Sequence, residues 1–488
     1  MEDLYKNKNS MNNSRADYQK VVNALKRCPK GSTAADICAL TAIPLSSVRE
    51  LLPEAADEYS GHLQVTQSGE ILYYFPGGFT SKYRGFFAFL KKAAEKAGLF
   101  IKKTLVLLFK IWIMVMLIGY FILFLAIAVM TLVLSMASKS GGKGGKTSLG
   151  LFDLLIRIWF YSELTKPHKG RYSGRIKKAK RPLHKAVFSF VFGEEDPDKE
   201  WKIRLDESVI GFIQSNNGVI SLPEYMIFSG ENSLEAEQSI LSFCFKYSGS
   251  PEMTEENTIV YRFDELLLRS DAKRIKKLSP GIQRLKTFSS NTKNMNIGLI
   301  VINAVNLVFG SFFLQQVMTH GLLTTDLQYR LASKMYAYTY FFFNYFSASP
   351  HVTIGIVLGI IPLVFSVFFW LIPLFRHIKE KKDNEKIKLA NFKRFSFNKI
   401  WSSLKKIKTD MFSPPNDECR PKDLNAASEK AIKDIGAFSS PEVEIDENGD
   451  AVYSFNELER EKNALNKYRS SIDANRPEIG QTVFDSNS

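Results

Sequence analysis

Cysteine is scarce in this sequence, and its few histidines form no ligand pattern. The 488 residues include four cysteines, Cys28, Cys38, Cys244 and Cys419, which lie far apart and never as C-x-x-C. Such scatter argues against a disulfide framework, a zinc module or an iron–sulfur cluster held by this chain alone. The six histidines show no H-E-x-x-H or similar spacing. We therefore expect no metal site and no cofactor.

A catalytic constellation is also lacking. No Ser–His–Asp set and no pair of carboxylates can be argued from spacing alone. Residues 140–147, SGGKGGKT, approach the phosphate-loop pattern G-x-x-x-x-G-K-[ST], but Ser140 stands where glycine is required. An apolar run rather than a buried strand precedes it, so a flexible cationic linker is the better interpretation. We expect that the protein is not an enzyme.

Charge is nearly absent from three long apolar runs. Residues 104–136 carry one charge, Lys110, and residues 295–318 and 352–375 carry none. A helix of about 20 apolar residues crosses the hydrocarbon core of a bilayer, so each run predicts a membrane segment. The sequence thus predicts an α-helical multi-pass membrane protein.

The first apolar run has an awkward length. As one helix it would be about 50 Å long, against a hydrocarbon core of about 30 Å, and it is too short for two full spans. One alternative is that Lys110 reaches the interface and 111–136 forms a single tilted span. The other is that the chain turns in a tight hairpin near Gly119.

The distribution of positive charge favours the hairpin. The flanks 82–110, 166–185, 269–293 and 376–408 contain eight, nine, eight and twelve Lys or Arg, whereas 319–350 contains two. The positive-inside rule places the four flanks in the cytoplasm and 319–350 outside, in a bacterial inner membrane. A single first span would put 82–110 outside, so we expect the hairpin. Together with the net charge of +15, the flanks also predict contact with anionic lipid headgroups.

The last two apolar runs carry residues suited to helix packing. Asn303, Asn306 and Gly310 share one helical face, and Gly355 and Gly359 form G-x-x-x-G in the final run. We interpret these five residues as helix-packing candidates. The alternative, that the asparagines line a transport path, stays open.

One short phrase occurs three times in the polar parts of the chain. GEILYYF (69–75), NTIVYRFDEL (257–266) and GDAVYSFNEL (449–458) each alternate as a half-buried strand does. In the first two copies, helices and a two-stranded hairpin follow in the order of a winged-helix domain. The third copy shows only helix 425–437 and the hairpin plainly, and its first half is expected in 397–412 or is missing.

The charge of the third helix argues against DNA binding in the first two copies, and only the third copy is mildly basic, with Lys430 and Lys433 against Glu429 and Asp434. In a winged helix this element enters the major groove, where it needs basic residues. In the first copy Arg49 stands among acids, and in the second Glu235 and Glu237 outnumber Lys246. Such helices repel phosphates, so we expect protein partners rather than nucleic acid.

The stretch KAVFSFVFGEEDPDKEW (185–201) carries a family resemblance. It matches the run V-F-S-F-V-F-G-x-x-D-P, which is found in a family of membrane proteins in cyanobacteria and plant chloroplasts. The chain therefore resembles that family. The resemblance covers residues 150–290, and the matching residues include Phe188, Phe190, Phe192, Gly193, Asp196 and Pro197. Some plant members have been labelled with iron–sulfur cluster assembly, which the scattered cysteines do not support. Physically, an apolar run followed by Gly and an acidic turn suggests a segment that docks against the membrane or its neighbour.

These observations divide the chain into membrane segments, basic flanks and α+β winged-helix-like soluble domains. The expected segments are a disordered tail (1–15), a winged-helix-like domain (16–78), a basic juxtamembrane helix (79–103), a membrane hairpin or single span (104–136), a basic linker with an amphipathic helix (137–185), a winged-helix-like domain (186–270), a basic flank (271–294), a transmembrane helix (295–318), an external aromatic-rich loop (319–351), a transmembrane helix (352–375), a basic flank (376–412), a partial winged-helix-like domain (413–460) and a polar tail (461–488). We expect a scaffold or regulatory assembly factor. A transport-related component and a membrane-tethered DNA-binding regulator are the alternatives.

Overall fold

The chain folds into two compact units, which are described separately. The computed structural model describes residues 15–28, 31–80, 86–137, 182–270, 281–320, 333–437, 441–447, 449–473 and 480–486. The repeat unit comprises the described residues of 1–93, 196–286 and 382–488, and the bundle unit those of 94–195 and 287–381. The described chain is mostly helical, and its three small sheets lie in the repeat unit.

The N-terminal part of the repeat unit consists of three helices and a hairpin. Residues 15–25 form the first helix, followed by α2 (Ala34–Thr41), α3 (Leu45–Glu58), β1 (His62–Thr66) and β2 (Ile71–Tyr74). Thr33 and Asp36 form a reciprocal capping box that begins α2. β1 and β2 pair antiparallel, and Ser32, just before α2, bridges Tyr73 of β2.

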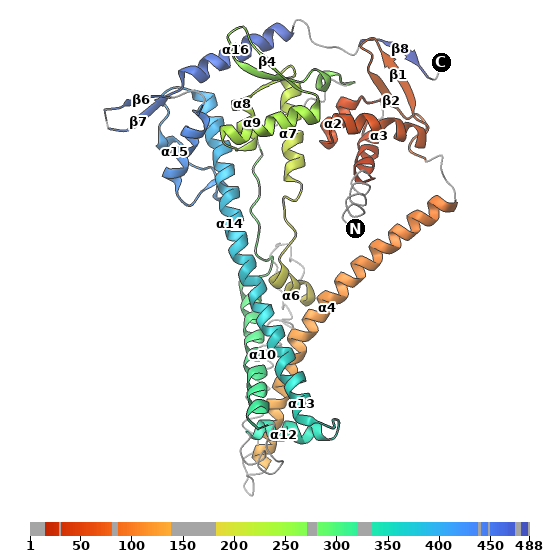
Figure 1. Cartoon of the computed structure of the whole chain (residues 1–488), viewed down its shortest axis with the longest axis vertical. Helices are drawn as coiled ribbons and strands as arrows, with labels where there is room; N and C mark the ends of the chain where they lie inside the picture. The colour runs from red at the N-terminus through yellow and green to blue at the C-terminus, as the bar shows by residue number, and fades with distance from the viewer. Residues whose placement is uncertain are drawn as a thin grey trace, which may run out of the picture. The chain divides into compact units, whose positions relative to one another are not determined.

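The middle part has the same element order with a fuller sheet (Figure 1). Its elements are α7 (Trp201–Ser215), β3 (Val219–Ser221), α8 (Leu222–Ser229), α9 (Ser233–Tyr247), β4 (Ser250–Met253), β5 (Ile259–Arg262) and the 3₁₀ helix η1 (Asp264–Leu267). β5 lies between β3 and β4 and is antiparallel to both. Capping boxes of Ser221 with Glu224 and of Asn232 with Glu235 begin α8 and α9.

The C-terminal part begins with the second half of a long helix. Its elements are α14 (Ile361–Ser403), the 3₁₀ turns η4 (Thr409–Met411) and η5 (Asp417–Cys419), α15 (Leu424–Ile435), β6 (Glu442–Ile445), β7 (Ala451–Ser454), α16 (Asn456–Asp473) and β8 (Thr482–Asp485). β6 and β7 form an antiparallel hairpin, and Ile407 bridges Tyr453 of β7. The end of α14 and the bridge at Ile407 therefore lie in 397–412, the region proposed for the first half of this copy. Two 3₁₀ turns occupy the place of the second helix.

The predicted polar tail 461–488 is wrong for most of its length. α16 continues to Asp473 and buries Leu465 and Ile472 against other parts of the repeat unit. β8 then pairs antiparallel with β1, which gives the N-terminal sheet the order β2-β1-β8. The polar composition of this segment hid a helix whose apolar positions are few but buried.

The phrase that recurs three times in the sequence has a structural explanation. The tyrosine of each copy lies opposite one residue of the segment that follows the first helix of its part. These pairs are Tyr73 with Ser32, Tyr261 with Ile220, and Tyr453 with Ile407. Two residues after each tyrosine, a phenylalanine packs into or against one shared core: Phe75, Phe263 and Phe455. The repeated phrase is thus the second strand of each hairpin. This strand joins the hairpin to the segment that follows the first helix of the same part.

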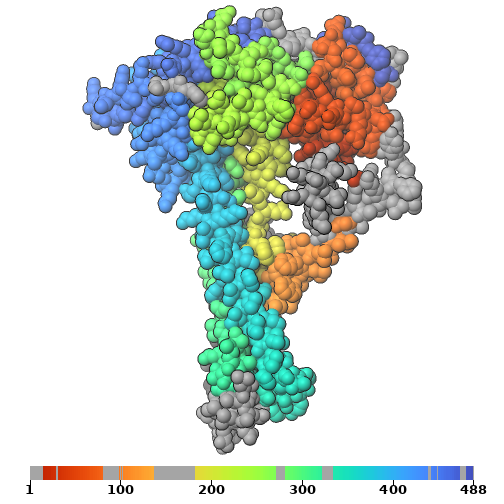
Figure 2. All heavy atoms as spheres, viewed as in Figure 1, coloured from red at the N-terminus to blue at the C-terminus, as the bar shows by residue number. Residues whose placement is uncertain are grey.

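One hydrophobic core joins the three parts of the repeat unit. Buried side chains from all three belong to the same cluster, and Figure 2 shows the parts in direct contact. A buried ion pair links the first two parts, because Asp36 accepts from Arg269 Nε at 3.1 Å. Arg469 of α16 donates to Glu224 of α8 at 2.6 Å and so links the last two. Buried charges are tolerated only when paired in this way.

The bundle unit is built from three long apolar helices and several short helices, among the described residues. Its elements are most of α4 (Phe86–Ala137), α6 (Leu183–Phe192), α10 (Lys293–His320), α12 (Lys334–Asn344), α13 (Pro350–Ile354), the π-helical segment η3 (Gly355–Ile360) and the first half of α14. Pro362 follows η3 and has no N–H to donate to the preceding turn, which explains the widened helix before it.

α4 is one unbroken helix, so the expected hairpin near Gly119 is wrong. The helix passes through Gly119 without interruption for 52 residues. A glycine inside a helix costs only about 1 kcal/mol relative to alanine. A tight turn in apolar surroundings would leave several backbone N–H and C=O groups without partners, and each of these costs more.

The packing clusters give the direction of each long helix. The cluster at one end of the bundle contains Ile113, Leu299 and Phe369, and the cluster at the other end contains Phe124, Phe313 and Ile354. α4 and α10 therefore run in the same direction and α14 runs in the opposite one. α6 belongs to the first cluster, so Ala137 and Leu183 lie toward opposite ends of the bundle.

Three helices among the described residues are long and apolar enough to cross a membrane. They are Lys103–Met136, Lys293–His320 and Pro350–Ser403. The last one continues well beyond 375, where the apolar run ends. Several predictions fall outside the described residues: the tail over 1–14, the linker over 138–181 with its amphipathic helix, and parts of 271–294 and 319–351.

Candidate docking surface on helix α9

α9 has one face committed to the core. The Asn232 side chain accepts a hydrogen bond from the Glu235 N–H at 2.9 Å and begins the helix. Ala236, Ile240 and Phe243 on the inner face are buried in the core of the repeat unit. The sequence of the helix therefore satisfies the ordinary requirement for one apolar face.

The outer face of α9 is apolar as well. Leu234, Leu241 and Phe245 are 69%, 48% and 94% exposed. Their spacings of seven and four residues place them in one line along the helix. Single exposed apolar residues are common on proteins, but an aligned set on one helix indicates a contact surface. We call these three residues the α9 stripe.

Acidic residues flank the α9 stripe. Glu235 and Glu237 are exposed on the same helix. Lys246, the helix's single cation, lies 3.4 Å from Asp206. Burial raises the pKa of Asp206, and Lys246 opposes that shift. The surroundings of the α9 stripe therefore favour a positively charged partner.

Tyr247 fixes the end of α9. Its hydroxyl lies 2.9 Å from the Ala42 carbonyl and 3.0 Å from an Asp206 carboxylate oxygen. It is fully buried against Phe243, with ring centroids 4.4 Å apart. Because α9 is held on its inner face and at its end, the α9 stripe is presented on a rigid element.

The corresponding helices of the other two parts expose different chemistry. On α3, Glu50 and Glu54 are exposed, and Arg49 pairs with Glu70 and Glu265 at 3.2 and 3.0 Å. On α15 the exposed charges are mixed, with Lys430, Lys433 and Glu429. None of the three helices presents the cationic face that contact with DNA phosphates requires.

The five helix-packing candidates lie between the helices of the bundle unit. Asn303 donates to the Ser366 carbonyl at 3.0 Å, and Asn306 donates to the Leu117 carbonyl at 2.8 Å. A Cβ on Gly310 would lie 3.3 Å from the Gly359 carbonyl oxygen, and one on Gly359 would lie 3.2 Å from the backbone of Leu314. Gly355 faces Val317 in the same way. Larger side chains at the three glycines would push the helices apart.

The motif residues of 187–197 divide between the two units. Phe190 stacks on Phe369 at 5.5 Å, and Phe192 contacts Phe109 at 5.8 Å. Gly193 has φ +85°, and a Cβ there would lie 2.6 Å from Arg376 Nη1. Phe188 lies under the Lys110 ammonium. Thus Phe188, Phe190, Phe192 and Gly193 hold α6 against the long helices of the bundle unit.

Asp196 and Pro197 belong to the repeat unit. Asp196 accepts from the Asp198 N–H at 2.9 Å and lies 3.6 Å from Lys286 Nζ. The Asp196 side chain thus caps the turn that leads into α7. Neither of these two contacts involves Pro197.

Reactive and metal-binding groups are not gathered in the described part of the chain. Among the described residues, no three His, Cys, Asp or Glu side chains are placed to hold a metal ion. The four cysteines are buried and unpaired by disulfides. Burial raises the pKa of the Cys38 thiol well above its usual range and that of Cys244 to about 12. Such thiols are poor nucleophiles at neutral pH.

Sequence reasoning overlooked the α9 stripe, although a signal for it exists. In SLEAEQSILSFCFKY (233–247), apolar residues occur on two opposite helical faces. A globular surface helix needs only one apolar face. The second face was obscured because the charges of Glu235, Glu237 and Lys246 were weighed only for their effect on DNA.

Comparison with known proteins finds one kind of similarity. No family model matches the chain, and no solved structure matches it. The chain is 22% identical, over 421 residues, to an uncharacterized chloroplastic protein of Arabidopsis thaliana, covering 79% of this chain and 72% of the relative. This supports a resemblance to plant, chloroplast-type proteins and gives no support to a bacterial inner membrane.

Proposed function

We propose that the protein is a multi-pass membrane scaffold whose α9 stripe docks a helix of a protein partner. The exposed line of Leu234, Leu241 and Phe245 on a rigid helix carries the proposal. Burying a side chain of this kind contributes about 1.5–3 kcal/mol, and an exposed aromatic residue is a typical binding hot spot. The partner segment is an amphipathic helix with an apolar face and Lys or Arg beside it, which complements Glu235 and Glu237.

The element order supports a winged-helix-like interpretation of the three parts. In the middle part, helix, short strand, two helices and a hairpin follow in turn, with the last strand between the other two. In this arrangement α9 is the exposed helix that winged-helix proteins use for recognition. Its apolar and acidic surface supports a protein partner in place of DNA.

The distribution of charge supports a membrane location for the bundle unit. Lys110, Lys185, Lys293 and Arg376 lie toward the end that contains α6, while His320 and the aromatic helix α12 lie toward the other. Cationic residues at one end and tyrosines at the other are typical of helices that cross a bilayer. By the positive-inside rule the cationic end faces the compartment in which the protein is made.

The proposal is tested by site-specific photo-crosslinking of the full chain in its own membrane. A crosslinking amino acid at position 245 should give an adduct with one protein, whereas the same group at Ile445, exposed by 77% on β6, should not. In a double variant that carries the crosslinking amino acid at position 245 and Leu241→Asp, the yield of the adduct should fall by about tenfold or more, since a carboxylate would be buried in the contact.

Two further variants test the charge of the partner. Glu235→Lys together with Glu237→Lys should weaken the adduct, and Glu50→Lys on α3 should leave it unchanged. Adducts of equal yield at 245 and 445, or adducts with lipid alone at 245, would contradict the docking surface. Salt-dependent retention of the intact protein on duplex DNA would favour the DNA-binding alternative instead.

The transport alternative stays a prediction. Asn303 and Asn306 direct their amide groups to carbonyls of neighbouring helices, which is the use expected for contacts between membrane helices. A flux that is lost in Asn306→Ala while the protein still assembles would favour transport.

A further inference from the structure

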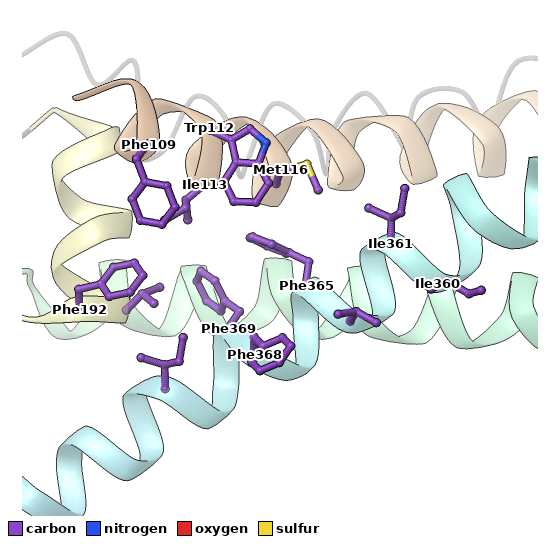
Figure 3. A pocket seen from close by; sticks show the side chains of 13 residues that line it. Phe109, Trp112, Ile113, Met116, Phe192, Ile360, Ile361, Phe365, Phe368 and Phe369 are labelled. Carbon is purple, nitrogen blue, oxygen red and sulfur yellow. The ribbon is translucent and has the colours of Figure 1, made fainter. Parts of the chain in front are cut away.

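The bundle unit contains an apolar cavity of about 410 Å³ between α4, α6 and α14. Figure 3 shows the aromatic side chains that surround it, among them Phe109, Trp112, Phe192 and Phe365. All thirteen lining side chains are apolar or aromatic. Apart from the indole N–H of Trp112, the lining side chains offer no hydrogen-bonding group, so the cavity suits a hydrocarbon.

The cavity is elongated along the helices. Its lining extends from Ile360, the last residue of η3, to Ile372 on α14, which corresponds to about 18 Å at 1.5 Å per residue. On α4 the lining extends from Phe109 to Met116. A hydrocarbon core is about 30 Å thick, or about 15 Å for each leaflet, so the cavity is about as long as one leaflet is deep. Its length suits an extended chain better than a compact ring system.

A cation stands at the end of the cavity nearest α6. Lys110 Nζ lies 4.2 Å from the centroid of the Phe188 ring, and Phe188 contacts Phe192 of the cavity wall at 4.8 Å. Lys110 has no carboxylate partner among the described residues. It is also the single charge in the apolar run 104–136.

A second cation at this end of the bundle, Arg376, is already engaged. Arg376 donates to the carbonyls of Phe190 and Phe288 at 2.8 and 2.7 Å and to Glu380 at 2.7 Å. These bonds attach two segments to α14: α6, and the segment around Phe288 that precedes α10. Lys110, which lies on a ring in contact with the cavity wall, is therefore available to meet an anionic headgroup.

We propose that the cavity holds one acyl chain of an anionic membrane lipid, whose headgroup binds Lys110. The inference rests on the proposed membrane location. The bound lipid would fill the space that α6 leaves between α4 and α14. It would thereby stabilise the contact made by the V-F-S-F-V-F-G segment.

The test uses the full chain purified in a mild neutral detergent. Native mass spectrometry counts bound lipid, and thermal unfolding is followed with added phosphatidylglycerol or phosphatidylcholine of the same acyl chains. The wild type should retain phosphatidylglycerol in preference to phosphatidylcholine. Lys110→Gln should bind it about fivefold more weakly, because one cation near the membrane surface contributes about that much. Met116→Trp should remove the bound lipid by filling the cavity.

Matched variants keep the test specific. Lys103→Gln removes an exposed cation one heptad earlier on α4, and Val133→Trp enlarges an exposed side chain outside the cavity. Both should behave as the wild type. Equal binding of the two lipids, or full retention of lipid by Met116→Trp that remains folded by circular dichroism, would overturn the proposal. Release from membranes by an alkaline wash would instead contradict the membrane location itself.

Discussion

At the residue scale, Glu461 of α16 places a carboxylate where burial disfavours its charge. Burial, with a smaller contribution from the Glu224 carboxylate, raises the pKa of Glu461 to about 7. In the unfolded chain the pKa is near its ordinary value of about 4.3. Protonation of Glu461 therefore stabilises the folded state, and this stabilisation is complete below the unfolded pKa and lost as the pH rises through about 7.

We expect Glu461→Gln to flatten this pH dependence. The variant should be more stable than the wild type at pH 8.5 by about 3 kcal/mol and nearly equal to it at pH 4.5. Thermal unfolding of the detergent-solubilised protein across this range measures the difference. Glu457→Gln, at an exposed site on the same helix, is the control and should follow the wild type. A constant offset between Glu461→Gln and the wild type at all pH values would refute the assignment.

Single residues differ in how well the sequence announces them. The spacing of Asn303, Asn306 and Gly310 already indicates one helical face, because periodicity along one helix is local information. The partners of these residues, Ser366 and Leu117, are not local and appear only in the fold. Phe245 is the opposite case. Phenylalanine is usually buried in a protein core, and only the structure shows that this one is 94% exposed.

At the element scale, β8 completes the N-terminal sheet from the other end of the chain. The Gln67 N–H donates to the Gln481 carbonyl, and the Leu63 N–H donates to Ser486 Oγ, each at 2.9 Å. Val483 and Phe484 of β8 are 69% and 58% exposed, so the strand buries little apolar surface. β8 is therefore attached mainly by backbone hydrogen bonds, which contribute about 1 kcal/mol each.

Removal of residues 474–488 should uncover the edge of β1 without unfolding the repeat unit. In hydrogen exchange, the amides of Leu63 and Gln67 should lose protection. The Thr66 amide, which bonds to the Glu70 carbonyl within the hairpin at 3.0 Å, should keep its protection. A fall in the unfolding temperature of more than about 10 °C would show that β8 stabilises the core, contrary to this account.

A helix or strand is easier to predict from sequence when the residues that stabilise it are close to it along the chain. The hairpins were anticipated from sequence because their signals lie within a few residues. β8 escaped because its partner strand is more than 400 residues away, as the pairing of Gln64 with Asp485 shows. The hairpin expected near Gly119 failed for another reason: it was inferred from charge on the flanks, whereas the local backbone favours a continuous helix.

At the scale of the whole molecule, the continuity of α4 changes how the chain would cross a membrane. The charge pattern required 82–110 and 166–185 on one side, and a hairpin was one way to achieve this. In the structure Leu183 lies toward the same end of the bundle as Ile113 of α4, and Ala137 lies toward the other end. Lys110 and Lys185 therefore share one end of the bundle although α4 is one unbroken helix, and the charge pattern does not require a hairpin.

This topology predicts a definite pattern of cysteine labelling. The four native cysteines are buried, which keeps the background low. Met136→Cys and Thr319→Cys, at the far ends of α4 and α10, should react with a membrane-impermeant maleimide from one side of sealed vesicles. Glu50→Cys and Ser290→Cys should react only from the opposite side. A hairpin in 104–136 would place position 136 on the same side as position 50, so labelling of Met136→Cys together with Glu50→Cys would refute the single crossing.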